Sequence, residues 1–320
     1  MFGWAGKVLA VDLSEGSWES KSFPEQFYHQ WLGGPGLNIA LHTGKMAGWE
    51  KLAGDAVAIA SGALVGSPLM GANTWSAVGP SSPEPGLAIA YGTGNWGAYL
   101  KFAGWDQVIL ERTAVRPSYL VIDKNGCCLE EIQEPVEDAG AIAKFIRKKI
   151  GDAEAAILVF TFQGIVSDRG LVFEDQFAVG SLLAKRNLRA IAIQKQGSVN
   201  LADPETVLNE AHKAVQRWLI TGMKWGYSGC LACHGSCRQS EQSVTYKEND
   251  QVAFSLWLAA GICPQLIASG ASPWAAADLD KLICAVTGWQ CSREQLWKNA
   301  HSIYNANKVL REELGGWFGK

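Results

Sequence analysis

Three cysteines within eight residues constrain this chain more than any other feature of its sequence. Cys230, Cys233 and Cys237 form a C-x2-C-x3-C motif, and a loop with this spacing can turn all three thiolates towards one point. Soft thiolate ligands suit Zn²⁺ or an iron–sulfur cluster. Either centre requires a fourth ligand. The candidates are the other soft donors within or after the motif: His234, Cys263, Cys284 and Cys291.

The spacing favours an iron–sulfur cluster over other metal centres. Cys230, Cys233 and His234 also match the C-x-x-C-H pattern of haem attachment, but that chemistry belongs to exported proteins, and the first residues lack the basic and apolar regions of an export signal. Radical-SAM enzymes have the opposite order, C-x3-C-x2-C. Zn²⁺ held by three cysteines and a histidine or a fourth cysteine remains an alternative. A [4Fe–4S] cluster is our first choice, because a loop often supplies three of its ligands and a distant helix the fourth.

Cys263 is the preferred fourth ligand. It ends an apolar segment at residues 261–264, where glycine and proline let the backbone turn towards the loop. Cys284 lies in the middle of a predicted helix among core residues, and Cys291 is the reserve choice. Cys127 and Cys128 are adjacent in a predicted strand, so their side chains point to opposite faces and cannot easily share a metal.

Composition predicts a globular protein. A chain of 320 residues with 48% hydrophobic residues can form two domains or one large one. A net charge of −3 provides no basic field for nucleic acid or anionic lipid, and no apolar run approaches the roughly 20 residues that span a bilayer. Eight cysteines without an export signal favour a reducing compartment, so we expect a cytoplasmic protein.

Residues 1–200 predict a mixed, mostly antiparallel α+β domain. Hydrophobic periodicity and turn signals predict its elements. Strands are expected at 6–13, 17–23, 56–61, 74–79, 86–91, 118–123, 127–132, 155–160 and 188–194, and helices at 37–47, 138–150 and 176–184.

Residues 201–320 predict a smaller all-α domain that carries the cysteine loop. Asp203 and Pro204 form a helix start, and Ser292 with Gln295 forms a capping box. Helices are expected at 204–222, 250–262, 274–286 and from 292 onwards.

A glycine-rich segment raises a competing hypothesis. Residues 92–97 have the G-x-G-x-x-G pattern between a strand and a helix, and Glu111 closes the next strand, as in dinucleotide-binding proteins. The neighbouring strands, however, are predicted to be antiparallel and lack the parallel β-α-β repeats of such folds. We therefore interpret the glycines as packing residues of a tight turn.

Several motifs together resemble the tungsten-dependent aldehyde:ferredoxin oxidoreductase family. They occur in the family's order at residues 6–14, 31–37, 100–106, 186–192, 230–237, 259–263 and 287–314. The resemblance implies a pterin-binding first domain and a [4Fe–4S] cluster held by Cys230, Cys233, Cys237 and Cys263. It also implies a shortened member of about half the usual length, because only 25 residues separate Cys237 from Cys263, where the family has most of its helical domains and its acid–base residues.

The motifs differ from the family where the pterin should bind. Pro35 and Gly36 replace an Arg-Gly pair, Thr74 replaces an arginine, and residues 174–178, which include Phe177, replace a glycine-rich stretch. Glycines let backbone amides approach a phosphate, whereas a bulky ring and carboxylates obstruct and repel it. We therefore expect a degenerate site that does not retain tungstopterin or molybdopterin.

Three functions follow. The leading hypothesis is an iron–sulfur electron-transfer or scaffold subunit of a redox complex, either a homo-oligomer or a partner of ferredoxin or of a catalytic paralogue. The second is an aldehyde or oxo-group oxidoreductase whose bis-pterin tungsten or molybdenum site is completed by another chain. The third is a structural zinc protein. The isolated chain is not expected to be catalytically complete.

The loss of the covering domains predicts an exposed apolar surface on the first domain, of the kind that marks an interface. Four tryptophans in or beside the family motifs are candidates for that surface: Trp31, Trp75, Trp96 and Trp105. The alternative is that these rings pack in the core, which explains the tryptophan content without a partner.

Overall fold

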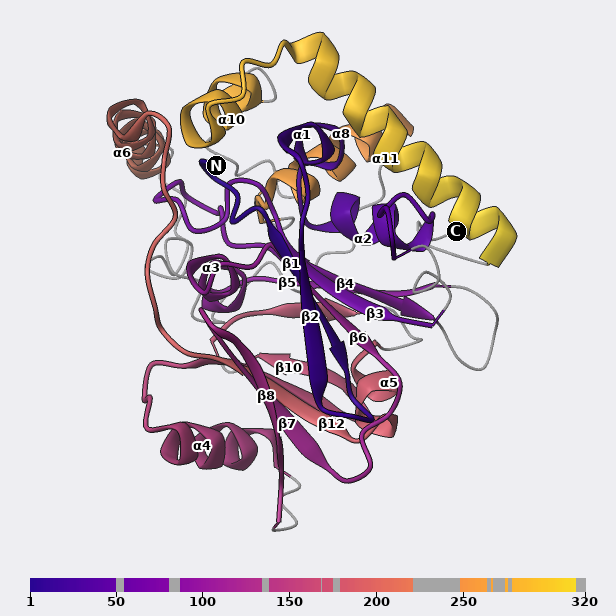
Figure 1. The fold of residues 1–320 in the computed structure, drawn as a ribbon. Helices are drawn as coiled ribbons and strands as arrows, with labels where there is room; N and C mark the ends of the chain where they lie inside the picture. Colours follow the sequence, from indigo (N-terminus) through magenta and orange to yellow (C-terminus); the bar gives the residue numbers. More distant parts are fainter. Residues whose placement is uncertain are drawn as a thin grey trace.

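A seven-stranded sheet forms the centre of the fold (Figure 1). The structure is a computed structural model, and it describes residues 1–49, 55–80, 87–133, 138–167, 169–174, 179–220, 248–263, 266, 274–275 and 278–314. The strands follow the order β11-β5-β4-β3-β6-β1-β2. They are β1 (Lys7–Asp12), β2 (Ser17–Ser22), β3 (Val57–Ser61), β4 (Trp75–Pro80), β5 (Leu87–Gly92), β6 (Gln107–Glu111) and β11 (Val172–Glu174). Strands β1 and β6 pair in parallel, and the other described neighbours pair antiparallel.

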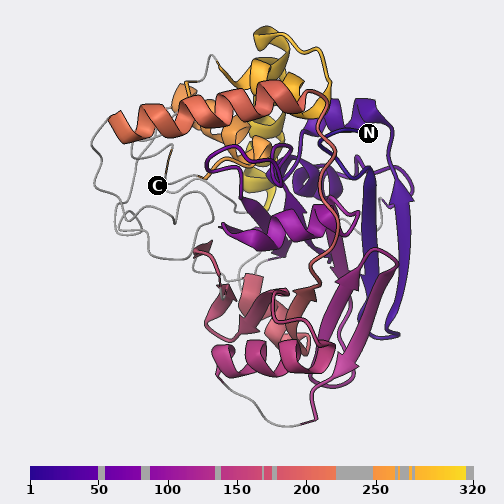
Figure 2. The ribbon, with the colours of Figure 1, turned by 90° about the vertical axis from the view of Figure 1, so that its left-hand side faces the viewer.

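A second sheet has the order β10-β9-β12-β7-β8. Its strands are β7 (Ser118–Asp123), β8 (Gly126–Glu131), β9 (Ala156–Thr161), β10 (Gly164–Ser167) and β12 (Leu188–Ile193). Helix α4 (Ala139–Ile150) covers its outer face (Figure 2).

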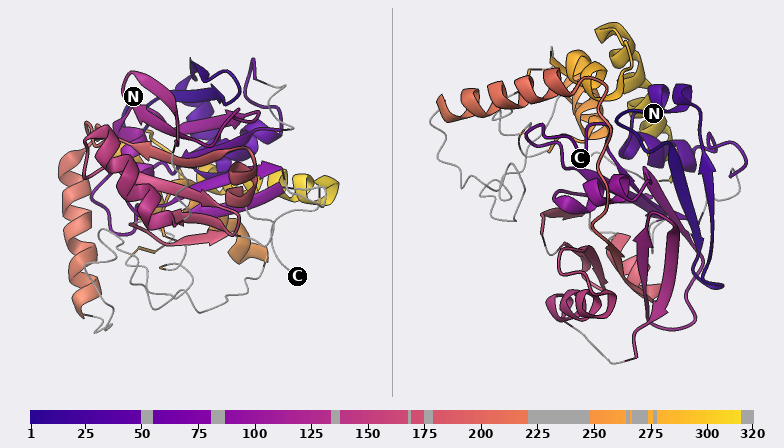
Figure 3. Two further views of the ribbon diagram at one scale, coloured as in Figure 1. Left: turned by 90° about the horizontal axis from the view of Figure 1, so that it is seen from below. Right: turned by 60° about the vertical axis from the view of Figure 1, so that its left-hand side comes forward.

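The other helices divide between two layers (Figures 1 and 3). One layer packs on the free face of the seven-stranded sheet: α1 (Glu25–Trp31), α2 (Pro35–His42), α8 (Glu248–Ala260), α10 (Leu279–Thr287) and α11 (Arg293–Leu314). Helices α3 (Asn95–Phe102) and α5 (Val179–Lys185) lie between the two sheets. Helix α6 (Pro204–Ile220) packs beside α10.

Both faces of the seven-stranded sheet are buried. In β1, Val8 and Ala10 belong to the core shared with the helical layer, whereas Leu9 and Val11 belong to the core shared with the second sheet. Consecutive strand residues point to opposite faces, so a sheet covered on both sides requires almost continuous apolar strands. This requirement explains why the strands at its centre lack polar alternation.

The structure confirms the predicted α+β class, with β-rich content first and helices later. Several helices differ at their boundaries; the helix expected at 250–262, for example, spans Glu248–Ala260. The helix expected at 37–47 starts at Pro35, a residue suited to the first turn, and ends at His42, where the Thr43 hydroxyl donates to the Ile39 carbonyl oxygen at 2.8 Å. The helix expected at 274–286 starts at Leu279, because the Asp278 carboxylate accepts from the Ala275 amide and forms a turn there.

The dinucleotide hypothesis is excluded by the strand arrangement. Strand β5 pairs antiparallel with β4, and β6 pairs antiparallel with β3. The segment from β5 through α3 to β6 is therefore not a parallel crossover, which a dinucleotide site of this type requires.

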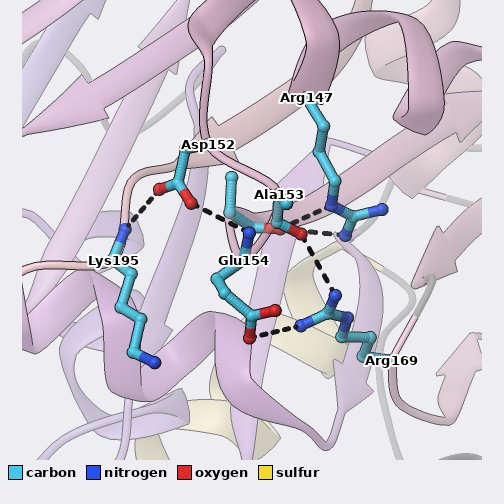
Figure 4. Close-up of polar contacts among 7 residues, drawn as sticks. Arg147, Asp152, Ala153, Glu154, Arg169 and Lys195 are labelled. Atoms are coloured by element: carbon cyan, nitrogen blue, oxygen red, sulfur yellow. Dashed lines mark hydrogen bonds and ion pairs between the residues drawn. The ribbon is translucent and has the colours of Figure 1, made fainter.

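The turn between α4 and β9 is fixed by polar contacts (Figure 4). The Asp152 carboxylate accepts from the backbone amides of Glu154 and Lys195, each at 2.9 Å. Arg147 donates to the Ala155 carbonyl oxygen at 2.9 and 3.1 Å, and Arg169 donates to the Ala153 carbonyl oxygen at 3.2 Å. These bonds attach the end of α4 to the residues just before β9 and just after β12.

Helix α4 has a side-chain cap at its first turn and a glycine stop at its end. The Asp138 carboxylate accepts from the Ala141 amide at 2.7 Å, and Gly151 adopts φ 68° after the last turn. Replacing Asp138 with Ala removes this N-cap and should lower the free energy of unfolding by about 1 kcal/mol, whereas Asp138→Asn, a competent cap, should change it by only a few tenths. Chemical denaturation of the two variants measures the difference. Equal stability of Asp138→Ala and the unaltered protein would show that the cap is not used.

Candidate metal centre

The structure places one of the four predicted cluster ligands. Cys230, Cys233 and Cys237, together with His234, lie outside the described residues, whereas Cys263, Cys284 and Cys291 lie within them. Within the described ranges, no group of three or more His, Cys, Asp or Glu residues is arranged to hold a metal. The geometry of the site is therefore that of Cys263 and its surroundings.

Cys263 lies three residues beyond α8, against the segment that leads into β4. Its backbone amide donates to the Gly71 carbonyl oxygen at 2.8 Å, and Ile262 forms an isolated antiparallel bridge with Ala72. The Thr74 amide donates to the Gly261 carbonyl oxygen at 3.0 Å. These backbone contacts attach the chain after α8 to the segment that leads into the seven-stranded sheet, at the position of the predicted ligand. Cys263 itself is half-buried.

The end of α8 is capped by the turn that follows β3. The amides of Ala63 and Leu64 donate to the carbonyl oxygens of Ala259 and Ala260 at 3.1 and 2.7 Å. Helix carbonyls at a C-terminus have no partner within the helix, and here the turn supplies one.

Two glycines permit this contact. Gly261 has φ 93°, which favours glycine. A Cβ atom on Gly62 would lie 2.1 Å from the Gly261 Cα atom, so the two backbones could not approach as they do with larger residues.

A buried lysine lies beneath the same turn. Lys101, on α3, is 4% exposed, and its Nζ donates to the carbonyl oxygens of Gly62 and Ala63 at 2.8 and 2.7 Å. Burial lowers the pKa of Lys101 to about 8, and the nearby Asp106 carboxylate opposes this shift. Asp106 accepts from the amides of Ala5 and Gly6 at 3.0 and 2.7 Å, and burial raises the pKa of its carboxyl group, an effect opposed by Lys101 and these amides. The only sign of either residue in the sequence is that each is charged within the otherwise uncharged 100–106 motif.

Two polar groups in the segment that pairs with residues 261–263 are buried without a hydrogen-bond partner in the described part of the chain. They are Oδ1 of Asn73 and Oγ1 of Thr74. Burial and, to a smaller extent, Cys263 raise the pKa of the Tyr91 hydroxyl group. Buried polar groups normally have partners, so this position could provide hydrogen bonds to a bound group.

The reserve ligands lie in a different environment. Gln290 donates to Cys284 Sγ at 3.0 Å, and Cys291 Sγ lies 4.0 Å from the Asp280 carbonyl oxygen. Burial, with Asp280 and Cys284, raises the pKa of Cys291 to about 12. The protonated thiol is thus favoured at Cys291, whereas a metal ligand must be a thiolate.

The adjacent cysteines of β8 point to opposite faces, as predicted. Cys127 packs partly buried against the core between the sheets, and Cys128 is exposed. Burial raises the pKa of Cys127 to about 12, with smaller effects of Cys128 and Asp123.

The expectation for the four tryptophans was wrong. Trp31, Trp75, Trp96 and Trp105 are 4%, 0%, 2% and 4% exposed, and all belong to the hydrophobic cores. Their rings fill the space within and around the seven-stranded sheet and cannot form an exposed apolar surface.

The described residues fit a pterin phosphate poorly. The segments 31–37 and 71–80 contain no lysine or arginine, and the ammonium group of Lys101 is already bonded to two carbonyl oxygens. Residues 175–178, with Phe177, lie outside the described residues. We therefore derive no step through a pterin-bound metal.

Comparisons with known proteins place the chain. A model of the N-terminal domain of aldehyde ferredoxin oxidoreductase matches residues 8–195. Tungsten-containing aldehyde ferredoxin oxidoreductases of Pyrococcus horikoshii and Pyrococcus abyssi are 26% and 28% identical to this chain. The alignments are 232 and 233 residues long and cover 68% of this chain. This chain aligns with 37% of the length of each relative.

A solved structure shares the fold. It is described as the active-site complex BamBC of benzoyl coenzyme A reductase with 1,5-dienoyl-CoA, and it matches 70% of this chain and 36% of its own chain with a TM-score of 0.63 at 20% identity. At this identity, the likeness concerns the fold. The family-domain match over more than half of the chain, together with these relatives, shows that the protein belongs to the aldehyde ferredoxin oxidoreductase family.

Proposed function

We propose that this protein is an iron–sulfur electron-transfer or scaffold subunit of a redox complex. Its [4Fe–4S] cluster would be held by Cys230, Cys233, Cys237 and Cys263. The observation that carries the proposal is the placement of Cys263, a half-buried thiol on a turn fixed against the family domain by the Gly71 and Thr74 hydrogen bonds. A division into an α+β domain of residues 1–200 and a helical domain of residues 201–320 is part of the same proposal.

The chemistry of the donor set agrees with a cluster. When bound, a [4Fe–4S] cluster accepts or donates one electron at a potential set by hydrogen bonds, charge and solvent exposure around its sulfurs. The role of this chain is to hold the thiolate ligands and to limit water at the Cys263 side. Half-burial of Cys263 and the backbone bonds around it would serve both purposes.

A second candidate is an oxidoreductase whose tungsten or molybdenum bis-pterin site is completed by another chain. The printed names of the relatives support it, because they describe tungsten-containing enzymes. The unpartnered buried hydroxyl group of Thr74 also supports it, since a ligand could bind there. The poor fit to a phosphate ranks it second. A structural zinc site is third.

The partners are also a proposal. The neighbour BamBC is described as a complex, which agrees with a subunit role, with a second copy, ferredoxin or a catalytic paralogue as the partner. A cytoplasmic location remains our expectation. None of the described helices is both long and apolar enough to cross a membrane.

The first test is the iron content of the protein purified without oxygen. We expect about four iron atoms and matching acid-labile sulfide per chain, with brown absorbance. Cys263→Ser should lose most of this iron, because it removes one ligand, and Cys284→Ser is the matched control that should keep it. The reverse pattern would move the fourth ligand to Cys284. Zinc in place of iron would favour the structural zinc site.

The second test concerns tungsten and molybdenum. We expect neither metal to co-purify with the isolated chain, and no aldehyde oxidation, because residues 31–37 and 71–80 provide no cation for a pterin phosphate. Elemental analysis and an aldehyde-dependent dye-reduction assay measure both. Stoichiometric tungsten with a pterin would establish the second candidate instead.

The third test concerns assembly. We expect the pure protein at micromolar concentration to sediment as an oligomer, or to do so once its redox partner is added. A stable monomer that binds no apolar dye and no ferredoxin would contradict the proposed subunit role.

A further inference from the structure

The turn after β3 connects a buried lysine to the segment that carries Cys263. On one side, Lys101 Nζ donates to the carbonyl oxygens of Gly62 and Ala63. On the other side, the amides of Ala63 and Leu64 cap the end of α8. The same few residues thus bind α3 and the end of α8, three residues before Cys263.

The turn and the Cys263 segment are in close backbone contact. Gly62 and Gly261 approach so closely that an added Cβ atom would overlap Gly261, and the Gly261 carbonyl oxygen accepts from Thr74. Any displacement of the turn therefore changes the position of residues 261–263. A second bond fixes the turn to α3, since the Ser61 hydroxyl donates to the Gly97 carbonyl oxygen at 2.6 Å.

We propose that Lys101 is the positioning residue for Cys263, acting through the Gly62–Ala63 turn. The inference rests on the proposed cluster function and adds to it a residue outside the ligand set. Without the ammonium group, the buried Ala63 carbonyl oxygen would lose its donor, which is costly, and the Gly62 carbonyl oxygen would keep only the Val65 amide at 3.2 Å. The turn is then held in the form that caps α8 and receives the Cys263 segment.

The position of the lysine has an electrostatic consequence. A buried cation stabilises added negative charge more than an exposed one, because the surroundings have a low dielectric constant. Reduction adds an electron to the cluster, so Lys101 favours the reduced state. Replacing it with a neutral side chain should make the midpoint potential more negative.

Asp106 provides the matched control. Its carboxylate lies in the same buried network, but it accepts from the amides of Ala5 and Gly6 and, within the described part of the chain, makes no hydrogen bond to residues 62–64. The Asp106 backbone carbonyl oxygen accepts from the Ser61 amide at 3.0 Å, and a side-chain substitution keeps that bond. Asp106→Asn should loosen the N-terminal segment and leave the Lys101 bonds in place. Lys101→Met keeps an unbranched side chain that is one heavy atom shorter and removes the three N–H donors.

The first measurement is hydrogen exchange, which does not require the cluster. In Lys101→Met, the Leu64 and Cys263 amides should exchange about tenfold faster, which is the order of effect expected from losing buried hydrogen bonds. The amides of the β7–β8 hairpin should be unchanged. In Asp106→Asn, the Ala5 and Gly6 amides should exchange faster, and Cys263 should keep its protection. Equal acceleration of Cys263 in both variants, or none in Lys101→Met, would overturn the inference.

The second measurement uses the protein with its cluster. Lys101→Met should release iron to a chelator several-fold faster than Asp106→Asn of equal thermal stability, and its midpoint potential should be more negative than that of the unaltered protein. Unchanged release and potential would contradict a positioning role. If the unaltered protein holds no iron, the proposed function fails, and the exchange measurement still decides the role of Lys101.

If Lys101→Met does not fold, exchange in the unaltered protein is decisive. If residues 62–64 and 261–263 form one cooperative unit, the hydrogen bonds of the Leu64 and Cys263 amides should open together, with the same free energy of opening. Independent opening, with Cys263 exchanging much faster than Leu64, would overturn the inference.

Discussion

The structure depends on burying both faces of the seven-stranded sheet. Residues of β1 alternate between two cores, one shared with the helical layer and one shared with α3, α5 and the second sheet. Helices from residues 25–42 and from residues 248–314 meet on the same face, so the two ends of the chain stabilise one another. The later helices cover a hydrophobic surface that the first part of the chain would otherwise expose to water.

Covering this face brings the end of α8 to the sheet, where polar groups fix its position. The capping amides of Ala63 and Leu64 and the close contact of Gly62 with Gly261 attach the segment that bears Cys263. A hydrophobic interface alone would allow the helix to slide, because apolar contacts have little directionality. Hydrogen bonds and a glycine-to-glycine contact give it one position, and such rigidity would suit the proposed role of Cys263 as a ligand.

Family membership and cofactor content are separate matters for this chain. The fold of the family domain is retained over residues 8–195, yet the segments at 31–37 and 71–80 lack the cations suited to a phosphate. The proposed thiol ligands, in contrast, are present in the sequence, and Cys263 is held against the domain. Fold and cofactor content can therefore differ, since function belongs to sites rather than folds.

The sequence by itself determined the α+β class, most of the strands and longer helices, and the faces of the β8 cysteines, because these follow from local periodicity, turn residues and the alternation of strands. Helix α1 and strands β10 and β11 were not predicted. Asp138, Gly151 and Asn125 marked ends and turns that the structure retains. Local signals could not place the tryptophans, because a large ring can lie equally in a core or at a surface, and only the packing of two sheets buried Trp75 and Trp96. They also could not reveal Lys101, whose partners are 38 and 39 residues away. Tertiary structure alone decides which carbonyl oxygens a buried ammonium group meets, because that choice depends on how distant segments pack.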